Sequence, residues 1–263
     1  CKERLVFFLY ALMSFLGACL GSFIALIAHR WPVGRSDLFG RSRCDACGKT
    51  LTVADLVPII SWLAQRGRCR HCGAAVSAFF AVVEVSGAGI GALAVAAAPG
   101  LAAPSAPMLA AAVLGWMLLA LAAIDVRHLI LPDGLTLPLL ALGLGYQSLW
   151  GPQPLSLAAL TALAVGGALW ALSTAYFHLR GREGLGLGDV KLLAAAGAWL
   201  GPLGLSVALL LGSLSGLAFV AVKTVSGERV DAGTPIPFGP FLALGTWIAF
   251  LAGPARLIAL LPA

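Results

Sequence analysis

Runs of about 20 apolar residues recur along the whole chain, and they constrain its fold more than any other feature. Of the 263 residues, 60% are hydrophobic and only 11% are charged, whereas a soluble domain carries about 25% charged residues. A bilayer interior offers no water to backbone N–H and C=O groups, so spanning segments form helices or closed barrels. These runs lack the alternating pattern of barrel strands. The sequence therefore predicts an all-α polytopic membrane protein.

The apolar runs predict about eight transmembrane helices. We expect them near residues 5–28, 79–98, 108–124, 135–150, 155–178, 189–200, 205–222 and 240–261. The first run is too long for a signal peptide, and no small-residue cleavage site follows it. We divide the chain into a first transmembrane helix at 1–28, a polar loop domain at 29–78 and a membrane domain at 79–263.

The basic residues predict which side of the membrane the loops face. All Lys and Arg residues except Lys2, Arg4 and Arg256 lie in or beside the loops that follow the first, third, fifth and seventh helices. The positive-inside rule makes these loops cytoplasmic. The net charge of +6 therefore reflects membrane topology, and we expect no nucleic-acid partner.

The polar segment holds a quartet of cysteines. Cys44 and Cys47 form one Cys-x-x-Cys pair, Cys69 and Cys72 form another, and a Gly follows each pair. This spacing is typical of a structural zinc site, because two intervening residues let both thiolates reach one tetrahedral ion. A Gly with positive φ can turn the chain tightly around the metal. Disulfides or free thiols are the alternative, but a reducing cytoplasm disfavours disulfides.

Two aspartates lie at the cytoplasmic ends of apolar runs. Asp125 ends the third expected helix, and Asp189 opens the sixth. Taken singly, Asp125 is equally well a solvated helix end and Asp189 a simple N-cap. Together they predict a carboxylate dyad, since an ionisable group at the edge of a bilayer is a functional candidate. The helix dipoles favour an ionised Asp189 and a protonated Asp125, which suits general acid–base hydrolysis by an activated water.

Other polar residues in the membrane domain are supporting candidates. Gly186 and Gly188 belong to a glycine-rich run before Asp189 that lets a substrate backbone approach, and Lys191 follows that acid. Asp133 comes directly after Pro132 and is interpreted mainly as the N-cap of the fourth helix. Glu84 lies inside the second helix, where it either pairs with a cytoplasmic Arg or belongs to a polar site.

These motifs resemble, in order and spacing, those of the prepilin peptidases, also called type IV leader peptidases. The matching segments are 21–23, 29–32, the two cysteine pairs, Glu84, 125–133, 186–192 and 237–240. The family consists of Gly-x-Gly-Asp membrane aspartic proteases. The resemblance implies that Asp125 and Asp189 are the catalytic pair and that 79–263 is the peptidase domain.

The resemblance also implies a substrate and a second activity. Substrates would be type IV prepilins or type II secretion pseudopilins, cut after a Gly at the cytoplasmic face of the bacterial inner membrane. Members with the cysteine domain often methylate the new N-terminus with S-adenosylmethionine. The chain departs from the family pattern at Ala25, at Asp45 and at 79–81, all in the N-terminal half, where methyl transfer is affected more than proteolysis. A basic leader would be drawn to anionic membrane lipid.

Two functions from other classes of protein are alternatives to a peptidase. A proton-coupled transporter would place acids near helix centres and show an internal repeat; three of the four membrane-associated acids here lie at one edge. A non-catalytic pilus or secretion assembly factor would use the zinc domain for docking and would tolerate Asp→Asn at both 125 and 189.

Overall fold

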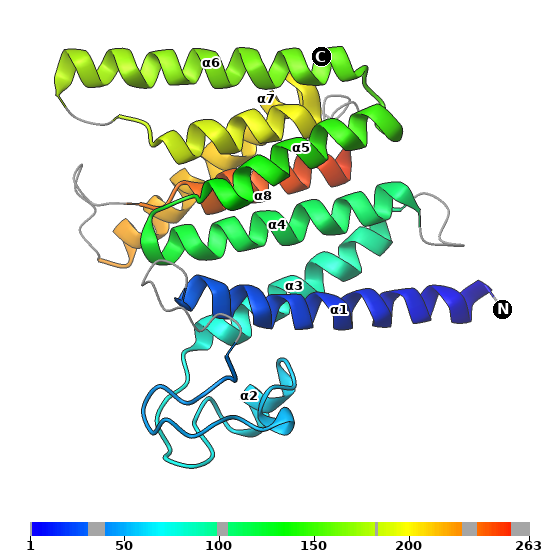
Figure 1. The fold of residues 1–263 in the computed structure, drawn as a ribbon, viewed down its shortest axis with the longest axis vertical. Coiled ribbons are helices and arrows are strands. Elements are labelled where there is room, and N and C mark those ends of the chain that lie inside the picture. The colour runs from blue at the N-terminus through cyan, green and yellow to red at the C-terminus, as the bar shows by residue number, and fades with distance from the viewer. Residues whose placement is uncertain (1, 31–39, 99–104, 182–183, 228–235, 254–263) are drawn as a thin grey trace. The chain divides into compact units, whose positions relative to one another are not determined.

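The computed structural model describes residues 2–30, 40–98, 105–181, 184–227 and 236–253 (Figure 1). Within these ranges the chain is helical, and β-pairing is limited to two isolated bridges, so the all-α prediction is confirmed. The elements are α1 Lys2–Arg30, η2 Val53–Asp55, α2 Ile60–Ala64, α3 Ala78–Ala97, α4 Ala106–His128, α5 Asp133–Leu149, α6 Leu155–Arg180, α7 Leu187–Val225 and α8 Gly239–Ala252. They fall into two compact units, Cys1–Ala112 and Val113–Ala263.

The helices follow the predicted apolar runs. In the described part of the chain, α1, α3, α4, α6 and α7 are each long and apolar enough to cross a membrane. α5 and α8 are shorter, at 17 and 14 residues. α7 joins the sixth and seventh expected helices, with a break at Gly201 where the sequence predicted one. The end of the eighth expected helix, 254–261, and the motif residues Trp31 and Pro32 lie outside the described residues.

Glycines bring α1 and α3 into backbone contact in the first unit. A Cβ at Gly87 would collide with the carbonyl oxygen of Gly17, and one at Gly91 with that of Met13. A Cβ at Gly21 would lie 2.7 Å from the Cα of Glu84. Helices in lipid gain little from burying apolar surface against each other, so this close approach is what holds such a pair together.

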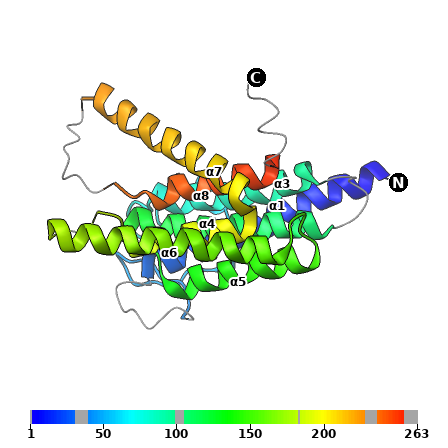
Figure 2. The same ribbon diagram turned by 90° about the horizontal axis from the view of Figure 1, so that it is seen from above.

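The first half of α7 is the core of the second unit. Residues 192–201 are buried without interruption, and α5, α6 and α8 all contact this helix. At Gly201 the backbone turns to φ 64° and ψ −173°, and Pro202 follows. Figure 2 shows the second half of α7 leaving the break in a new direction. At 39 residues, α7 is far longer than the roughly 20 residues that cross a bilayer, and the break divides it.

Two glutamines satisfy the carbonyl groups that the break in α7 sets free. Gln147 Nε2 donates to the Trp199 carbonyl at 2.6 Å, and Gln153 Nε2 donates to the Leu200 carbonyl at 2.6 Å. Trp199 in turn donates its indole N–H to the Leu139 carbonyl of α5 at 2.8 Å. An unpaired carbonyl would cost free energy in an apolar surrounding, so these side chains are what make an interrupted helix stable there.

We expect Gly87→Val to destabilise the first unit and Gly89→Val to be tolerated. Both residues are in α3, but a side chain at Gly87 meets the backbone of α1, whereas nothing lies within 4 Å of a Cβ at Gly89. Overpacking of this kind costs about 1–3 kcal/mol. Thermal unfolding in detergent measures the difference, and equal midpoints for the two variants would contradict the proposed packing.

Candidate active site and metal centre

Asp125 lies in the last turn of α4 and is buried, with 6% of its surface exposed. Its Oδ2 accepts a hydrogen bond of 3.0 Å from the backbone N–H of Gly239, the first residue of α8. A Cβ at Gly239 would lie 2.7 Å from the same oxygen. Glycine at 239 therefore lets the start of α8 reach the carboxyl group, and the positive end of the α8 dipole faces it.

Asp189 is in the first turn of α7 and is half-buried. The N-cap of α7 is Gly186, which has no capping side chain, and the helix begins at Leu187. Asp189 is thus the third residue of the helix, so the N-cap alternative is wrong. The carboxyl groups of Asp125 and Asp189 act on each other electrostatically. The structure therefore brings together, within one unit, two acids that are far apart in the sequence.

Leu131 fills the space between the two segments that carry these acids. A Cβ at Gly188, next to Asp189, would lie 2.8 Å from the Leu131 Cβ. A Cβ at Gly239, next to the Asp125 carboxyl group, would lie 3.3 Å from the Leu131 Cδ2. Gly186 also faces the dyad, since its Cβ would lie 3.5 Å from Asp189 Oδ2. Glycines at 188 and 239 therefore let Leu131 and the acid-bearing segments pack closely together.

An ion pair links the start of α5 to α7, the helix that carries Asp189. Lys191 Nζ lies 2.5 Å from Asp133 Oδ1, and both side chains are partly exposed. α5 begins at Asp133 and its N-cap is Pro132, so the N-cap interpretation of Asp133 is wrong by one residue. Helix ends are uncertain by one or two residues, so a capping position is easily assigned to its neighbour.

Gly239 is the residue that reasoning from the sequence missed. Its segment, 237–240, was matched to a family motif, but its N–H was not assigned to Asp125. The expected dipole argument considered only α4 and α7, whereas the N-terminus of α8 also points at Asp125. The signal in the sequence was a glycine between Phe238 and Pro240. Pro favours the first turn of a helix, and Gly permits another group to approach the helix start closely.

The four predicted cysteines meet in the first unit. The sulfurs of Cys44, Cys47, Cys69 and Cys72 all lie within 4.8 Å of one another and could hold a metal ion. Cys44 Sγ and Cys72 Sγ are 3.8 Å apart, far beyond the roughly 2.05 Å of a disulfide. A tetrahedral ion with Zn–S bonds of about 2.3 Å would place its sulfurs about 3.8 Å apart.

Two turns of the same shape present these sulfurs. Gly48 and Gly73 follow the pairs at φ 69° and φ 72°, as the sequence predicted. The Gly48 N–H donates to the Cys44 carbonyl and the Gly73 N–H to the Cys69 carbonyl, both at 2.9 Å. Each turn is thus closed by a hydrogen bond within its own backbone.

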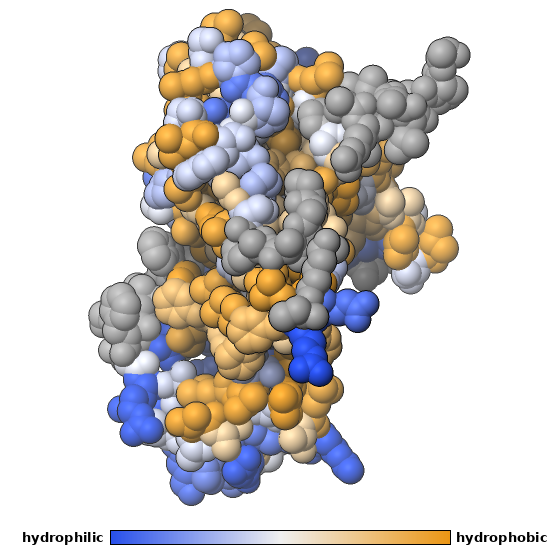
Figure 3. All heavy atoms as spheres, turned by 90° about the vertical axis from the view of Figure 1, so that its right-hand side faces the viewer, coloured by the Kyte–Doolittle hydropathy of each residue, from blue (hydrophilic) through white to orange (hydrophobic). Residues whose placement is uncertain are grey.

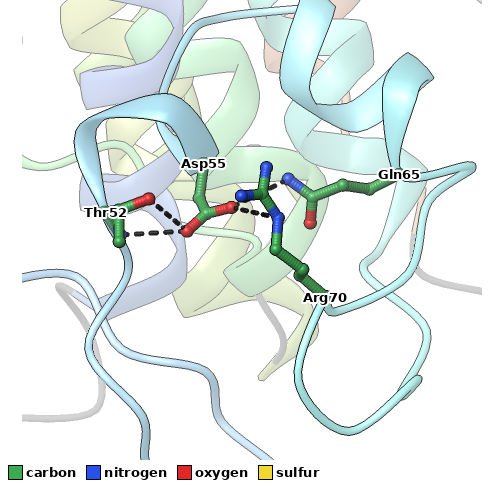
Figure 4. A network of polar contacts seen from close by, with 4 residues as sticks. All are labelled: Thr52, Asp55, Gln65 and Arg70. Atoms are coloured by element: carbon green, nitrogen blue, oxygen red, sulfur yellow. Dashed lines mark hydrogen bonds and ion pairs between the residues drawn. The ribbon is translucent and has the colours of Figure 1, made fainter.

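Asp55 organises the chain between the two turns (Figure 4). Its Oδ2 accepts bonds of 2.6 Å from Thr52 Oγ1 and 3.0 Å from the Thr52 N–H. Its Oδ1 lies 3.2 Å from both Gln65 Nε2 and Arg70 Nε. The Thr52 hydrogen bonds, and then the nearby Arg70, lower the pKa of Asp55 below its ordinary value. The second cysteine pair is therefore tied to the 52–55 turn through Arg70.

Glu84 joins the cysteine segment to α3. The side chain is buried, and Oε2 accepts a hydrogen bond of 2.6 Å from the Ile59 N–H. Ile59 precedes α2 at φ 66°, a conformation that is strained for a β-branched residue. Of the two interpretations of Glu84, a polar site agrees better with this hydrogen bond than a pair with a cytoplasmic Arg. The partner is a backbone N–H group and not a side chain.

Comparison with known proteins gives two family matches. The model of the bacterial peptidase A24 N-terminal domain matches residues 15–98, and that of the type IV leader peptidase family matches residues 112–221. A relative from Aeromonas hydrophila, named prepilin leader peptidase/N-methyltransferase, is 40% identical over 94% of this chain and 89% of its own length. A relative of the same name from Stutzerimonas stutzeri is 37% identical over 96% and 93%. No solved structure matches the chain.

Asp55→Asn tests the network around Asp55. A carboxyl group whose pKa falls on folding stabilises the fold above its ordinary value of 3.8, and this is lost as the pH falls through the lower folded value. The variant should therefore be less stable by about 1–3 kcal/mol, by the same amount from about pH 8 to about pH 5. Amide hydrogen exchange of residues 52–56 measures this. A difference that shrinks across that range would contradict the assignment.

Proposed function

Because the chain belongs to the type IV leader peptidase family, we propose that it is a membrane aspartic peptidase of the bacterial inner membrane. It removes the leader from type IV prepilins or type II secretion pseudopilins after a Gly, at the cytoplasmic face, and then methylates the new N-terminal amine. The observation that carries the proteolytic part is the meeting of Asp125 and Asp189 in a glycine-lined setting. The methyl-transfer part rests on the relatives' name, with S-adenosylmethionine as donor.

The two acids have different roles in hydrolysis. Asp189, half-exposed at the positive end of α7, takes a proton from water as the water oxygen bonds to the scissile carbonyl carbon. Asp125 gives its proton to the carbonyl oxygen. Gly239 already binds Asp125 Oδ2, so Oδ1 carries that proton. Collapse of the diol returns the proton to Asp125, while Asp189 protonates the leaving nitrogen as the C–N bond breaks.

Asp133 and Lys191 are positioning residues in this proposal. Their ion pair joins the first turn of α5 to α7, at a residue two positions after Asp189. It limits how far α5 and the helix that carries Asp189 can separate. A near-attack geometry needs this kind of restraint, because small misplacements of catalytic groups slow the reaction strongly.

The metal bound by the four cysteines is zinc, in a structural role. The donor set is all sulfur, which suits Zn²⁺, and the 3.8 Å spacing of Cys44 and Cys72 fits a tetrahedral site. All four positions are then taken by protein, so the ion holds the loop domain together and takes no part in peptide hydrolysis.

Asp125→Asn and Asp189→Asn should each lower leader cleavage of a co-expressed prepilin at least about 100-fold. An amide can neither accept nor release the required proton. Glu3→Gln is the control, because Glu3 is an exposed carboxylate in the first turn of α1, and it should cleave normally. Gel mobility of the pilin reports cleavage. If either dyad variant cuts at the wild-type rate while inserted in the membrane, the two-carboxylate mechanism fails and an assembly role gains support.

Gly239→Ala should lower kcat about 10- to 100-fold. The new methyl group would lie 2.7 Å from Asp125 Oδ2, so the carboxyl group or the start of α8 must move. Gly216→Ala is the control, since a Cβ there makes only ordinary contact at 3.4 Å with Phe241. Both variants are assayed with the same prepilin. Unchanged kcat for Gly239→Ala would show that the α8 N-terminus has no part in placing Asp125.

Elemental analysis of the purified chain should find one zinc ion per molecule. Cys69→Ser should reduce this to about none, because three thiolates bind the ion far more weakly. Cys19→Ser should retain the full amount, since Cys19 is a free cysteine in α1, outside the cluster. Equal metal content in the two variants, or a different metal in the wild type, would overturn the zinc assignment.

A further inference from the structure

The segment between α1 and α3 exposes apolar side chains on η2 and α2. The exposed fractions are 83% for Val53, 41% for Leu56, 65% for Ile60 and 61% for Leu63. Val53 and Leu56 are three residues apart on a 3₁₀ turn, and Ile60 and Leu63 are three apart on α2, so each pair shares one face. Large exposed apolar side chains grouped in this way mark an interaction surface.

Internal contacts hold this apolar face rigidly. η2 and α2 contact each other, and Gln65 at the end of α2 donates to Asp55 at the end of η2. Ile59, directly before α2, is fixed by its bond to Glu84 of α3. The face therefore does not need folding or ordering before it binds a partner, which removes one entropic cost of association.

The face lies beside the membrane-spanning helices of its own unit. The Ile59–Glu84 hydrogen bond ties it to α3, and a 3.1 Å contact between His29 Nε2 and Asp45 Oδ2 ties the segment to α1. Figure 1 draws α2 below α1, nearer to the C-terminal end of that helix than to its N-terminus. Phe23 of α1 and Val82 and Val85 of α3 also expose apolar side chains toward this end of the two helices, at 47%, 60% and 52%.

Basic residues surround the apolar face. The described residues 40–77 contain six Lys and Arg residues and two Asp residues. The basic residues are Arg41, Arg43, Lys49, Arg66, Arg68 and Arg70, and all are exposed. A zinc ion with four thiolates would add about −2 and leave the segment positive. Figure 3 shows apolar surface bordered by hydrophilic residues in this part of the molecule.

We propose that this face, Val53, Leu56, Ile60 and Leu63 with the surrounding arginines, docks on the anionic lipid surface of the membrane that α1 and α3 span. Apolar side chains with a basic border are the combination that binds anionic bilayer surfaces. The membrane is held next to the face by the two spanning helices, so even weak contacts keep it docked. The proposal rests on the chain spanning a membrane and does not depend on its peptidase activity.

Photocrosslinking of the full chain in lipid nanodiscs tests the proposal. The photoreactive amino acid p-benzoylphenylalanine replaces Leu63 on α2, or Ala46 as a control on the exposed turn of the first cysteine pair. Mass spectrometry then identifies each adduct. In nanodiscs containing phosphatidylglycerol, position 63 should give several-fold more lipid adduct than position 46. In phosphatidylcholine alone, the excess should fall.

The charge dependence gives a second arm. Arg66→Gln should lower the lipid adduct at position 63 about fivefold, the effect of one basic residue near an anionic surface. Raised salt should lower it in the wild-type background, which tests the same attraction even if the variant folds poorly. Equal lipid adducts at positions 63 and 46, no dependence on lipid charge, or adducts of position 63 mainly with another part of the chain would each overturn the proposal.

Discussion

A backbone N–H donated to a buried carboxylate fixes the functional segment of each unit. Asp125 accepts from Gly239 at the start of α8, and Glu84 accepts from Ile59 before α2. In both cases an acid on a membrane helix holds a segment that leaves the membrane region. A buried acceptor without a partner costs free energy. Each hydrogen bond therefore satisfies a buried acid and also fixes the segment that donates it.

Glycine makes these contacts possible wherever two backbones must approach. Gly17 and Gly87 join α1 to α3, and Gly239 admits the Asp125 carboxyl group. The same small residue thus serves both helix association in lipid and the close contact between α8 and the Asp125 carboxyl group. The chain has 32 glycines in 263 residues, so it is rich in positions where a single added methyl group would disturb the packing.

The helices, the break at Gly201 and the cysteine quartet could be predicted from the sequence, because each is set by a local pattern. Hydrophobic length sets the spans, Gly-Pro ends a helix and Cys-x-x-Cys spacing fixes a metal site. The partners of the acids could not be predicted. Gly239 is 114 residues from Asp125, and Lys191 is 58 from Asp133. Such pairings depend on how helices pack, and the capping interpretation of Asp133 misses by one residue because helix ends are uncertain by that much.

The interrupted α7 behaves as two rods joined at one point. The first rod carries Asp189 at one end and is buried along 192–201, and Gln147 and Gln153 grip its other end. The second rod exposes Leu210, Leu214 and Leu217 and packs closely against α8, since a Cβ at Gly245 would lie 2.3 Å from the Ala208 carbonyl oxygen. Because α8 begins at Gly239, which donates to Asp125, a change in the direction of the second rod would be transmitted through α8 to that carboxyl group.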